Sequence, residues 1–220
     1  MTSRAAQPRR SQAERRSDSE EALLNSAAAL IAERGVERAS LGSIGEHAGA
    51  SRGLPTHHFG SKDALVARLA ERVQADVAAA ATERLERRMH RTPDSPPALD
   101  VLRTTLDTYL ELFEHPSDDE RALIVMWGAT FPSNASIDGM LEADRRSYDG
   151  WAELIRHGQQ DGSIRSDLDA TASAVVLFGL MRGVAALLLT ESDVADMHNV
   201  RATCDAWIVS ALAPADGNSE

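Results

Sequence analysis

The stretch from Ser40 to Lys62, SLGSIGEHAGASRGLPTHHFGSK, constrains the fold of this chain most. Apolar residues recur there in short segments that Gly49 and Gly60 interrupt, and hydroxyl residues stand where helices can begin. The pattern predicts two short helices and the start of a third, which is a helix-turn-helix. Lys62 is the only lysine of the chain and lies at the start of the third of these helices. Because a cation there opposes the helix dipole, we interpret it as the partner of an anion such as DNA phosphate.

Length and composition favour an all-α fold. The 220 residues suit one large domain or a small domain joined to a larger one, and only 4% of them are aromatic. Alanine is abundant, and β-branched runs between turn residues are scarce, so helix is favoured over sheet. The single cysteine, Cys204, rules out an intrachain disulfide and is expected to be a small buried side chain.

Charge is distributed unevenly along the chain. The net charge is -11, but residues 1–62 hold nine Lys or Arg against seven Asp or Glu, whereas the remainder holds 14 against 27. This asymmetry favours a DNA-facing first third on an acidic body. The alternative is a solvated basic tail on an acidic protein. Residues 1–18 lack hydrophobic periodicity and are predicted to be a disordered basic arm, which either reaches into a DNA groove or has no role.

Hydrophobic periodicity predicts a chain of helices. The expected helices cover residues 19–34, 41–48 and 51–59, a long segment from 61, and then 98–114, 120–131, 137–160, 167–189 and 195–212. Pro55 lacks an amide hydrogen, so the helix over 51–59 should start late or have an irregular first turn. We therefore expect a domain over 19–62, a larger helical domain over 63–213 and a tail over 214–220.

The order and spacing of several residues are similar to a known family. These residues are Gly35, Ser40, Ile44 with Gly45, Ala48 with Gly49, Ser51, Gly53, His58 with Phe59, and Ser61 with Lys62. Over about residues 19–70 the chain resembles the TetR family of bacterial one-component transcriptional regulators. Pro55 and Thr56 depart from the Leu-Tyr pair that the family usually has, so the base-reading contacts are left open.

The resemblance implies an N-terminal three-helix helix-turn-helix domain joined through a fourth helix to a larger ligand-binding and dimerisation domain. It implies that Ser40, Ser51 and His58 contact phosphates or position the backbone, and that Lys62 clamps a phosphate. The residues that would face the major groove are Arg52, Gly53, Thr56 and His57. Chemistry agrees with this division, because the groove admits a helix, arginine pairs with guanine, and glycine permits close backbone approach.

Large side chains of the second domain are candidates for a ligand pocket. They come from separate predicted helices and are Tyr109, Phe113, Met126, Trp127, Phe131, Trp151 and Met181. Plain core packing is expected for most of them, and about a third should line a pocket. Arg182 lies within an apolar segment and needs a carboxylate partner or an interface, solvent, or an anionic ligand, in that order of preference.

Several other classes of protein find little support. The dinucleotide-binding pattern GxGxxG, the phosphate-loop pattern GxxxxGK[ST] and the zinc-protease pattern HExxH do not occur, and we expect no enzyme activity, cofactor or metal. Residues 172–189 are apolar enough for a membrane span, but Gly179, Arg182 and Gly183 interrupt them, which favours a buried interface helix. No signal-peptide pattern opens the chain, so a cytoplasmic location is expected.

These observations lead to one principal hypothesis. The chain is predicted to be a ligand-responsive repressor that binds a palindromic DNA operator as a homodimer through its last two helices and is released by a small, mostly apolar effector. A transcriptional activator and a ligand-independent regulator remain as alternatives. An unrecognised helical enzyme and an interaction module without DNA binding are the other classes.

Overall fold

The computed structural model describes residues 11–89, 96–129, 138–190 and 196–215, and every regular element within them is a helix. The all-α prediction is therefore confirmed. The helices follow the chain order α1 (Gln12–Arg34), α2 (Leu41–His47), α3 (Leu54–Phe59), α4 (Lys62–Met89), α5 (Ala98–Leu112), α6 (Asp118–Gly128), α7 (Asp138–Asp161), α8 (Ala170–Thr190) and α9 (Met197–Leu212).

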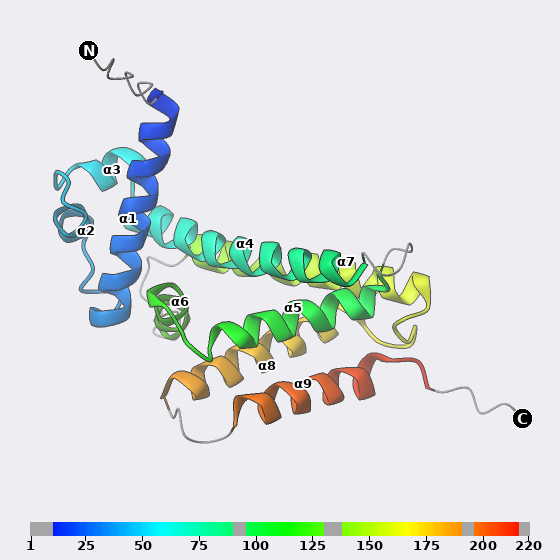
Figure 1. Cartoon of the computed structure of the whole chain (residues 1–220). Coiled ribbons are helices and arrows are strands. Elements are labelled where there is room, and N and C mark those ends of the chain that lie inside the picture. The colour runs from blue at the N-terminus through cyan, green and yellow to red at the C-terminus, as the bar shows by residue number, and fades with distance from the viewer. Residues whose placement is uncertain (1–10, 90–95, 130–137, 191–195, 216–220) are drawn as a thin grey trace, which may run out of the picture.

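The first three helices form a small head at one end of a larger helical body (Figure 1). Helix α4 starts in the head and runs along the body, so one continuous helix joins the two. The core of the head draws Leu23 and Ile31 from α1, Ile44 from α2, and Leu65 and Leu69 from α4, all almost fully buried. Burying these side chains stabilises the short helices α2 and α3, which have too few residues to persist alone.

Helix α1 starts earlier than the sequence predicts. Ser11 caps it: the Ser11 hydroxyl accepts from the Glu14 amide at 3.1 Å, and the Glu14 carboxylate accepts from the Ser11 amide at 2.6 Å. This reciprocal capping box satisfies amides that a helix end leaves unpaired. Residues 12–18 are thus helical, and the prediction of a disordered arm over 1–18 is wrong for them. Residues 1–10 lie outside the described part of the chain.

The junction between α2 and α3 depends on two glycines. Gly49 has a φ of 67°, and the Ala50 amide donates to the Gly45 carbonyl at 2.9 Å, which closes α2 with a left-handed turn. A Cβ on Gly45 would lie 2.5 Å from the Ser51 carbonyl oxygen, so the two segments approach too closely for any other residue. Helix α3 begins only at Leu54, with Pro55 buried in its first turn. The predicted late start of this helix is confirmed.

The body is a layered bundle in which α4, α5, α7 and α8 surround a common core. Helix α6 packs on α1, which connects body and head a second time, and α9 packs on α5. The first amides of α5 are bound from the end of α7: Ala98 donates to Asp161 at 2.9 Å and Leu99 donates to the Ser163 hydroxyl at 3.2 Å. These bonds replace the side-chain cap that Pro97 cannot supply.

Helix α8 is the one described helix that is long and apolar enough to cross a membrane by length and composition. It packs closely on α7 in the body, and 28% of its apolar window is buried. Its two faces differ, because Leu177 and Met181 are buried whereas Val175 and Val176 are exposed. The prediction of an interface helix over this segment stays a prediction.

Candidate nucleic-acid interface and interhelical cavity

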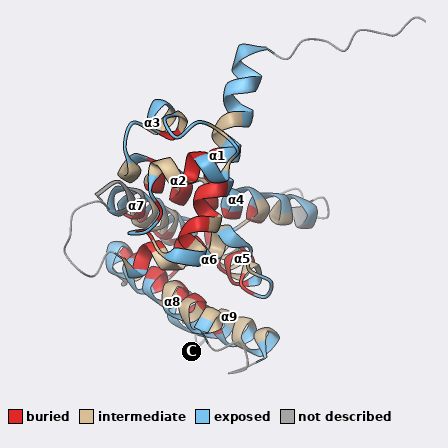
Figure 2. Cartoon of the chain, turned by 90° about the vertical axis from the view of Figure 1, so that its left-hand side faces the viewer, coloured by how far each residue is buried: buried red, intermediate tan, exposed pale blue. Residues whose placement is uncertain are grey.

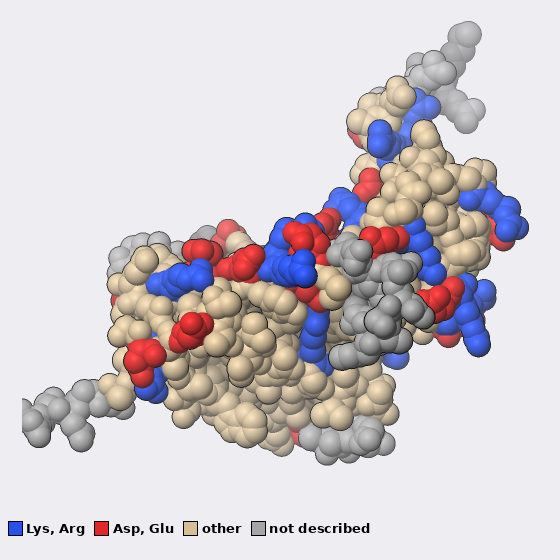
Figure 3. Space-filling view, turned by 180° about the vertical axis from the view of Figure 1, so that it is seen from behind, with Lys and Arg blue, Asp and Glu red and all other residues tan. Residues whose placement is uncertain are grey.

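The eight residues predicted to contact DNA lie within one continuous part of the head. They come from the start of α2, the turn before α3, α3 itself and the first residue of α4. Six are exposed, namely Ser40, Ser51, Arg52, Gly53, Thr56 and His57, and the other two, His58 and Lys62, are half-buried. Figure 2 shows α3 at the exposed edge of the head. Lys and Arg side chains lie on the outer surface of the head with acidic side chains beside them, and both kinds also alternate along one edge of the body (Figure 3).

Ser40 and Lys62 both bind the head itself in the free protein. The Ser40 hydroxyl caps α2 by accepting from the Ser43 amide at 3.1 Å. The Lys62 ammonium donates to the Glu37 carbonyl at 3.3 Å, in the loop between α1 and α2. This lysine therefore has an acceptor without any anion, and the argument from the sequence that only an anion would explain it is wrong. Its role toward phosphate stays a prediction.

Arg52 has a carboxylate neighbour that the sequence reasoning missed. One guanidinium nitrogen of Arg52 lies 2.7 Å from the Glu46 carboxylate, and both side chains are exposed. Glu46 is the sixth residue of α2, so the pair spans the turn of the motif. An acid at this position opposes the approach of phosphate.

A catalytic pattern also escaped the sequence analysis. Residues 49–53 read GASRG, which matches the GxSxG spacing of a hydrolase nucleophile elbow. That elbow requires a strand before the serine and a helix after it, whereas Ser51 lies in the turn between α2 and α3. The described part of the chain has no strand to place such a serine, so the match carries no catalytic meaning.

The body contains an apolar cavity of about 210 Å³ between five helices. Its lining residues are Val73, Gln74, Val77 and Ala78 of α4, Thr105 and Tyr109 of α5, Leu123 and Trp127 of α6, Ser147, Gly150 and Trp151 of α7, and Phe178 and Met181 of α8. Four predicted pocket residues are among them: Tyr109, Trp127, Trp151 and Met181. Ordinary ligand pockets have this character, with mostly apolar walls and a few polar groups.

The other predicted pocket residues do not line this cavity. Phe113 is buried beside Tyr109, with ring centroids 5.1 Å apart, and Met126 is fully buried in the core. Phe131 lies outside the described residues. Sequence reasoning missed Gln74, whose position on α4 toward α5 and α7 emerges only when those helices pack together.

Arg182 finds the buried carboxylate partner that was ranked first for it. It pairs with Asp144 of α7, whose side chain is only 2% exposed and also accepts from the Trp127 indole nitrogen at 3.3 Å. The guanidinium carbon lies 4.1 Å from the Trp127 ring centroid and 4.5 Å from that of Phe178. Arg182 therefore supports the cavity from behind its aromatic wall.

Two polar atoms at the cavity have no hydrogen-bond partner among the described residues, and both are buried. They are the Tyr109 hydroxyl and the amide nitrogen of Gln74. Burial raises the pKa of Tyr109 above its ordinary value, against a smaller opposing influence of Arg182, so the phenol keeps its proton at neutral pH. Buried polar groups are rarely left unpaired in this way.

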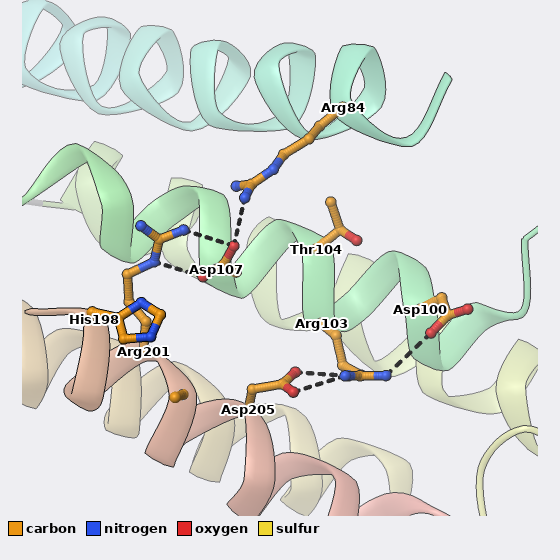
Figure 4. Close-up of a pocket in the computed structure, with 9 residues that line it drawn as sticks. Arg84, Asp100, Arg103, Thr104, Asp107, His198, Arg201 and Asp205 are labelled. Atoms are coloured by element: carbon orange, nitrogen blue, oxygen red, sulfur yellow. Dashed lines mark hydrogen bonds and ion pairs between the residues drawn. The ribbon is translucent and has the colours of Figure 1, made fainter. Parts of the chain in front are cut away.

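A second, more open cleft of about 420 Å³ lies between α4, α5 and α9 (Figure 4). Its charged side chains are already paired: Arg201 binds both Asp107 oxygens at 2.6 and 2.8 Å, and Arg103 binds both Asp205 oxygens at 2.7 Å. Arg84 reaches the same Asp107 from α4 at 2.9 Å. These ion pairs attach α9 to α5. The charged side chains of the cleft therefore already have a structural role. The described residues also contain no group of three or more potential metal ligands.

The outer surface of α8 and α9 is unusually apolar. Large exposed side chains there are Val175, Val176, Leu187 and Trp207, the last 64% exposed. Between the two helices lies a groove of about 290 Å³ whose lining includes Leu180, Val184 and Cys204. Exposed apolar patches of this kind mark interaction surfaces.

Comparison with known proteins identifies the family that the head resembles. The profile of bacterial regulatory proteins of the tetR family matches residues 23–69, which cover the head from α1 into α4. Residues 23–69 therefore carry the DNA-binding region that is typical of the TetR family. Relatives of the chain include the HTH-type transcriptional regulator UidR of Escherichia coli K12, which is 26% identical over 165 residues, covering 74% of this chain and 78% of UidR. The chain is thus similar over most of its length to a known transcriptional regulator.

Solved structures of transcriptional regulators share the fold of most of the chain. One is SmeT, the repressor of the Stenotrophomonas maltophilia multidrug efflux pump SmeDEF, with a TM-score of 0.68 and 23% identity over 90% of this chain and 91% of SmeT. Another is FadR of Bacillus subtilis in complex with stearoyl-CoA, with a TM-score of 0.70 and 16% identity over 86% of this chain and 97% of FadR. SmeT has also been solved with triclosan. Regulators with this fold therefore bind small molecules.

Proposed function

We propose that this protein is a ligand-responsive transcriptional repressor that binds a palindromic operator as a homodimer and is released by a small, mostly apolar effector. One observation carries the proposal: helix α4 forms part of both sites. Its first residue, Lys62, lies among the predicted DNA contacts, and Val73, Gln74 and Val77 form one wall of the apolar cavity. A ligand that changes the position of α4 therefore changes the placement of the head.

Polar contacts add a second connection between the head and the cavity region. Arg72 of α4 donates to Asn25 of α1 at 2.7 Å and to Asp119 of α6, so one side chain joins three helices. Arg72 directly precedes the cavity-lining Val73, and Leu123 and Trp127 of the cavity belong to α6. The effector would act by binding one arrangement of these helices more tightly than the other.

Dimerisation is supported by the apolar surface of α8 and α9. Isologous contact of this surface with a second copy would bury Val176, Leu187 and Trp207 in a four-helix interface. Two heads related by a two-fold axis would place their α3 helices in successive major grooves about 34–36 Å apart. The operator is then a palindrome, because its symmetry matches that of the protein.

Fluorescence anisotropy of the full chain with DNA from its own upstream region tests the proposal. We expect specific binding that weakens as salt rises, and derepression of the adjacent promoter when the gene is deleted. Loss of promoter activity after deletion would instead identify an activator. Failure to bind any upstream fragment at low salt would favour an interaction module.

A further inference from the structure

The unpaired polar atoms of the apolar cavity specify what the cavity binds. The Tyr109 hydroxyl and the Gln74 amide nitrogen are both buried and have no partner among the described residues, and both atoms belong to residues that line the same cavity. Tyr109 is 5% exposed, and most of the residues that line the cavity with it are apolar. A buried donor left unpaired destabilises the free protein, and a ligand that accepts its hydrogen bond removes that cost.

The charge around the cavity argues for a neutral ligand. Arg182 lies behind Trp127 and Phe178, and Asp144 balances its charge in a buried ion pair. The aromatic wall therefore already packs against a cation of the protein, and a cationic ligand would be repelled by it. An anionic ligand would lose its hydration without reaching Arg182, which is not among the lining residues and whose charge Asp144 already balances. The residues that line the cavity include no charged side chain that could pair with either kind of ion.

We propose that the effector is a neutral, mostly apolar carbonyl compound whose oxygen accepts hydrogen bonds from Tyr109 and Gln74. A ketone, an ester and a lactone share this chemistry. The cavity volume, about 210 Å³, equals that of roughly seven liquid waters and suits one ring with a short chain. This inference rests on the proposed effector role of the cavity and adds to it the class of ligand and the two residues that select it.

The test uses four probes of similar size with the full-length protein. Butyrophenone carries a carbonyl group, butylbenzene lacks it, hydrocinnamate is an anion and benzyltrimethylammonium is a cation. Calorimetric titration should give butyrophenone about tenfold tighter binding than butylbenzene, a difference of about 1.4 kcal/mol, since only the ketone accepts hydrogen bonds from the buried donors. Both ions should bind more weakly than butyrophenone.

Tyr109→Phe removes only the hydroxyl and gives two opposite readouts. It should weaken butyrophenone binding by about fivefold to twentyfold and leave butylbenzene binding unchanged. It should also raise the Tm of the free protein, because the unpaired hydroxyl disappears while the ring stays. Gln74→Met should weaken butyrophenone binding in the same sense. The matched control is Tyr148→Phe, since Tyr148 packs on Phe178 but does not line the cavity.

The outcomes separate this inference from the proposed function. The carbonyl assignment would be overturned, while the cavity remained a ligand site, by any of three results. Butyrophenone and butylbenzene could bind with equal affinity, or Tyr109→Phe could bind butyrophenone as tightly as the parent. Either ion could also bind more tightly than butyrophenone. If no probe bound and operator affinity were intact, the effector role of the cavity would fail together with the inference.

Discussion

Single side chains of the head are already engaged before any DNA arrives. Lys62 donates to the Glu37 carbonyl, and Arg52 pairs with Glu46. Both contacts are exposed, so each costs little to exchange for a phosphate oxygen or a base edge. The free structure thus keeps these cations in place near the predicted interface without fixing them.

Lys62→Ala tests the phosphate role of this lysine. Operator affinity should fall, and the slope of log affinity against log salt should decrease by about 0.9, as for the loss of one phosphate contact. The Tm should change little, because the bond to Glu37 is exposed. Arg87→Ala is the control, because Arg87 is exposed toward the other end of the same helix. If the slope were unaltered in Lys62→Ala, the phosphate role would be wrong, and the contact with Glu37 would be the role of this lysine.

At the residue scale, the sequence predicts the environment that a side chain needs better than it predicts which residue will be its partner. A charge in an apolar helix must be paired, and Arg182 is paired as expected. Its partner Asp144 could not be named, because the two are 38 positions apart and meet only through the crossing of α7 and α8. The unpaired state of Tyr109 and Gln74 is likewise a property of the packed helices, which no spacing in the sequence reveals.

At the scale of helices, the turn of the head depends on close approach at Gly45. Gly45→Ala would place a Cβ 2.5 Å from the Ser51 carbonyl, so α2 and α3 must separate. We expect a loss of roughly 1–3 kcal/mol in the free energy of unfolding, measured by urea denaturation, and loss of operator binding.

Gly53→Ala is the matched variant for this prediction. A Cβ there meets nothing within 4 Å, and the φ of -86° is open to any residue. Stability should be unchanged, while operator affinity should fall if the backbone at Gly53 approaches DNA closely. Equal destabilisation by both substitutions would contradict this account of the turn.

Helix boundaries show why some elements were easier to predict than others. The apolar periodicity that reveals α1 begins only at Leu23, so its polar first turns were assigned to a disordered arm, although Ser11 and Glu14 have the spacing of a capping box. Pro55, in contrast, fixes where α3 can begin, and its effect was predictable from covalent structure alone.

At the scale of the whole molecule, ion pairs hold the apolar helix α9 in place. Burial raises the pKa of Asp107, but the hydrogen bonds and charges of Arg201 and Arg84 outweigh burial and leave the pKa below 3.8. The stabilisation is therefore present above pH 3.8 and is lost as the pH falls through the lower pKa of the folded state. Asp107→Asn should lower the Tm at neutral pH, and its difference from the parent should shrink below about pH 4.

The comparison for this acid dependence is Glu83→Gln. Glu83 pairs with Arg87 at 2.6 Å, but both side chains are largely exposed, so its Tm should stay near that of the parent at all pH values. If Asp107→Asn behaved in the same way, the ion pairs between α5 and α9 would not contribute to stability.

The apolar surface of α8 and α9 makes a prediction about assembly. Trp207→Glu places a charge on a side chain that is 64% exposed in the single chain, so the fold should survive. Light scattering should then show the mass of one chain, 23.7 kDa, where the parent shows twice that mass, because a buried unpaired charge opposes dimerisation. Thr82→Glu, exposed on α4, is the control and should stay dimeric. A parent protein with the mass of one chain would contradict the dimer.

Selection of bound DNA from a random pool with the full-length protein tests the central claim most directly. The proposed dimeric repressor should enrich inverted repeats whose half-sites are centred about one helical turn, 10–10.5 base pairs, or a multiple of it apart. Lys62→Ala should enrich them poorly at the same salt concentration. Enrichment of single, unrepeated half-sites, or no enrichment even at low salt, would contradict the account.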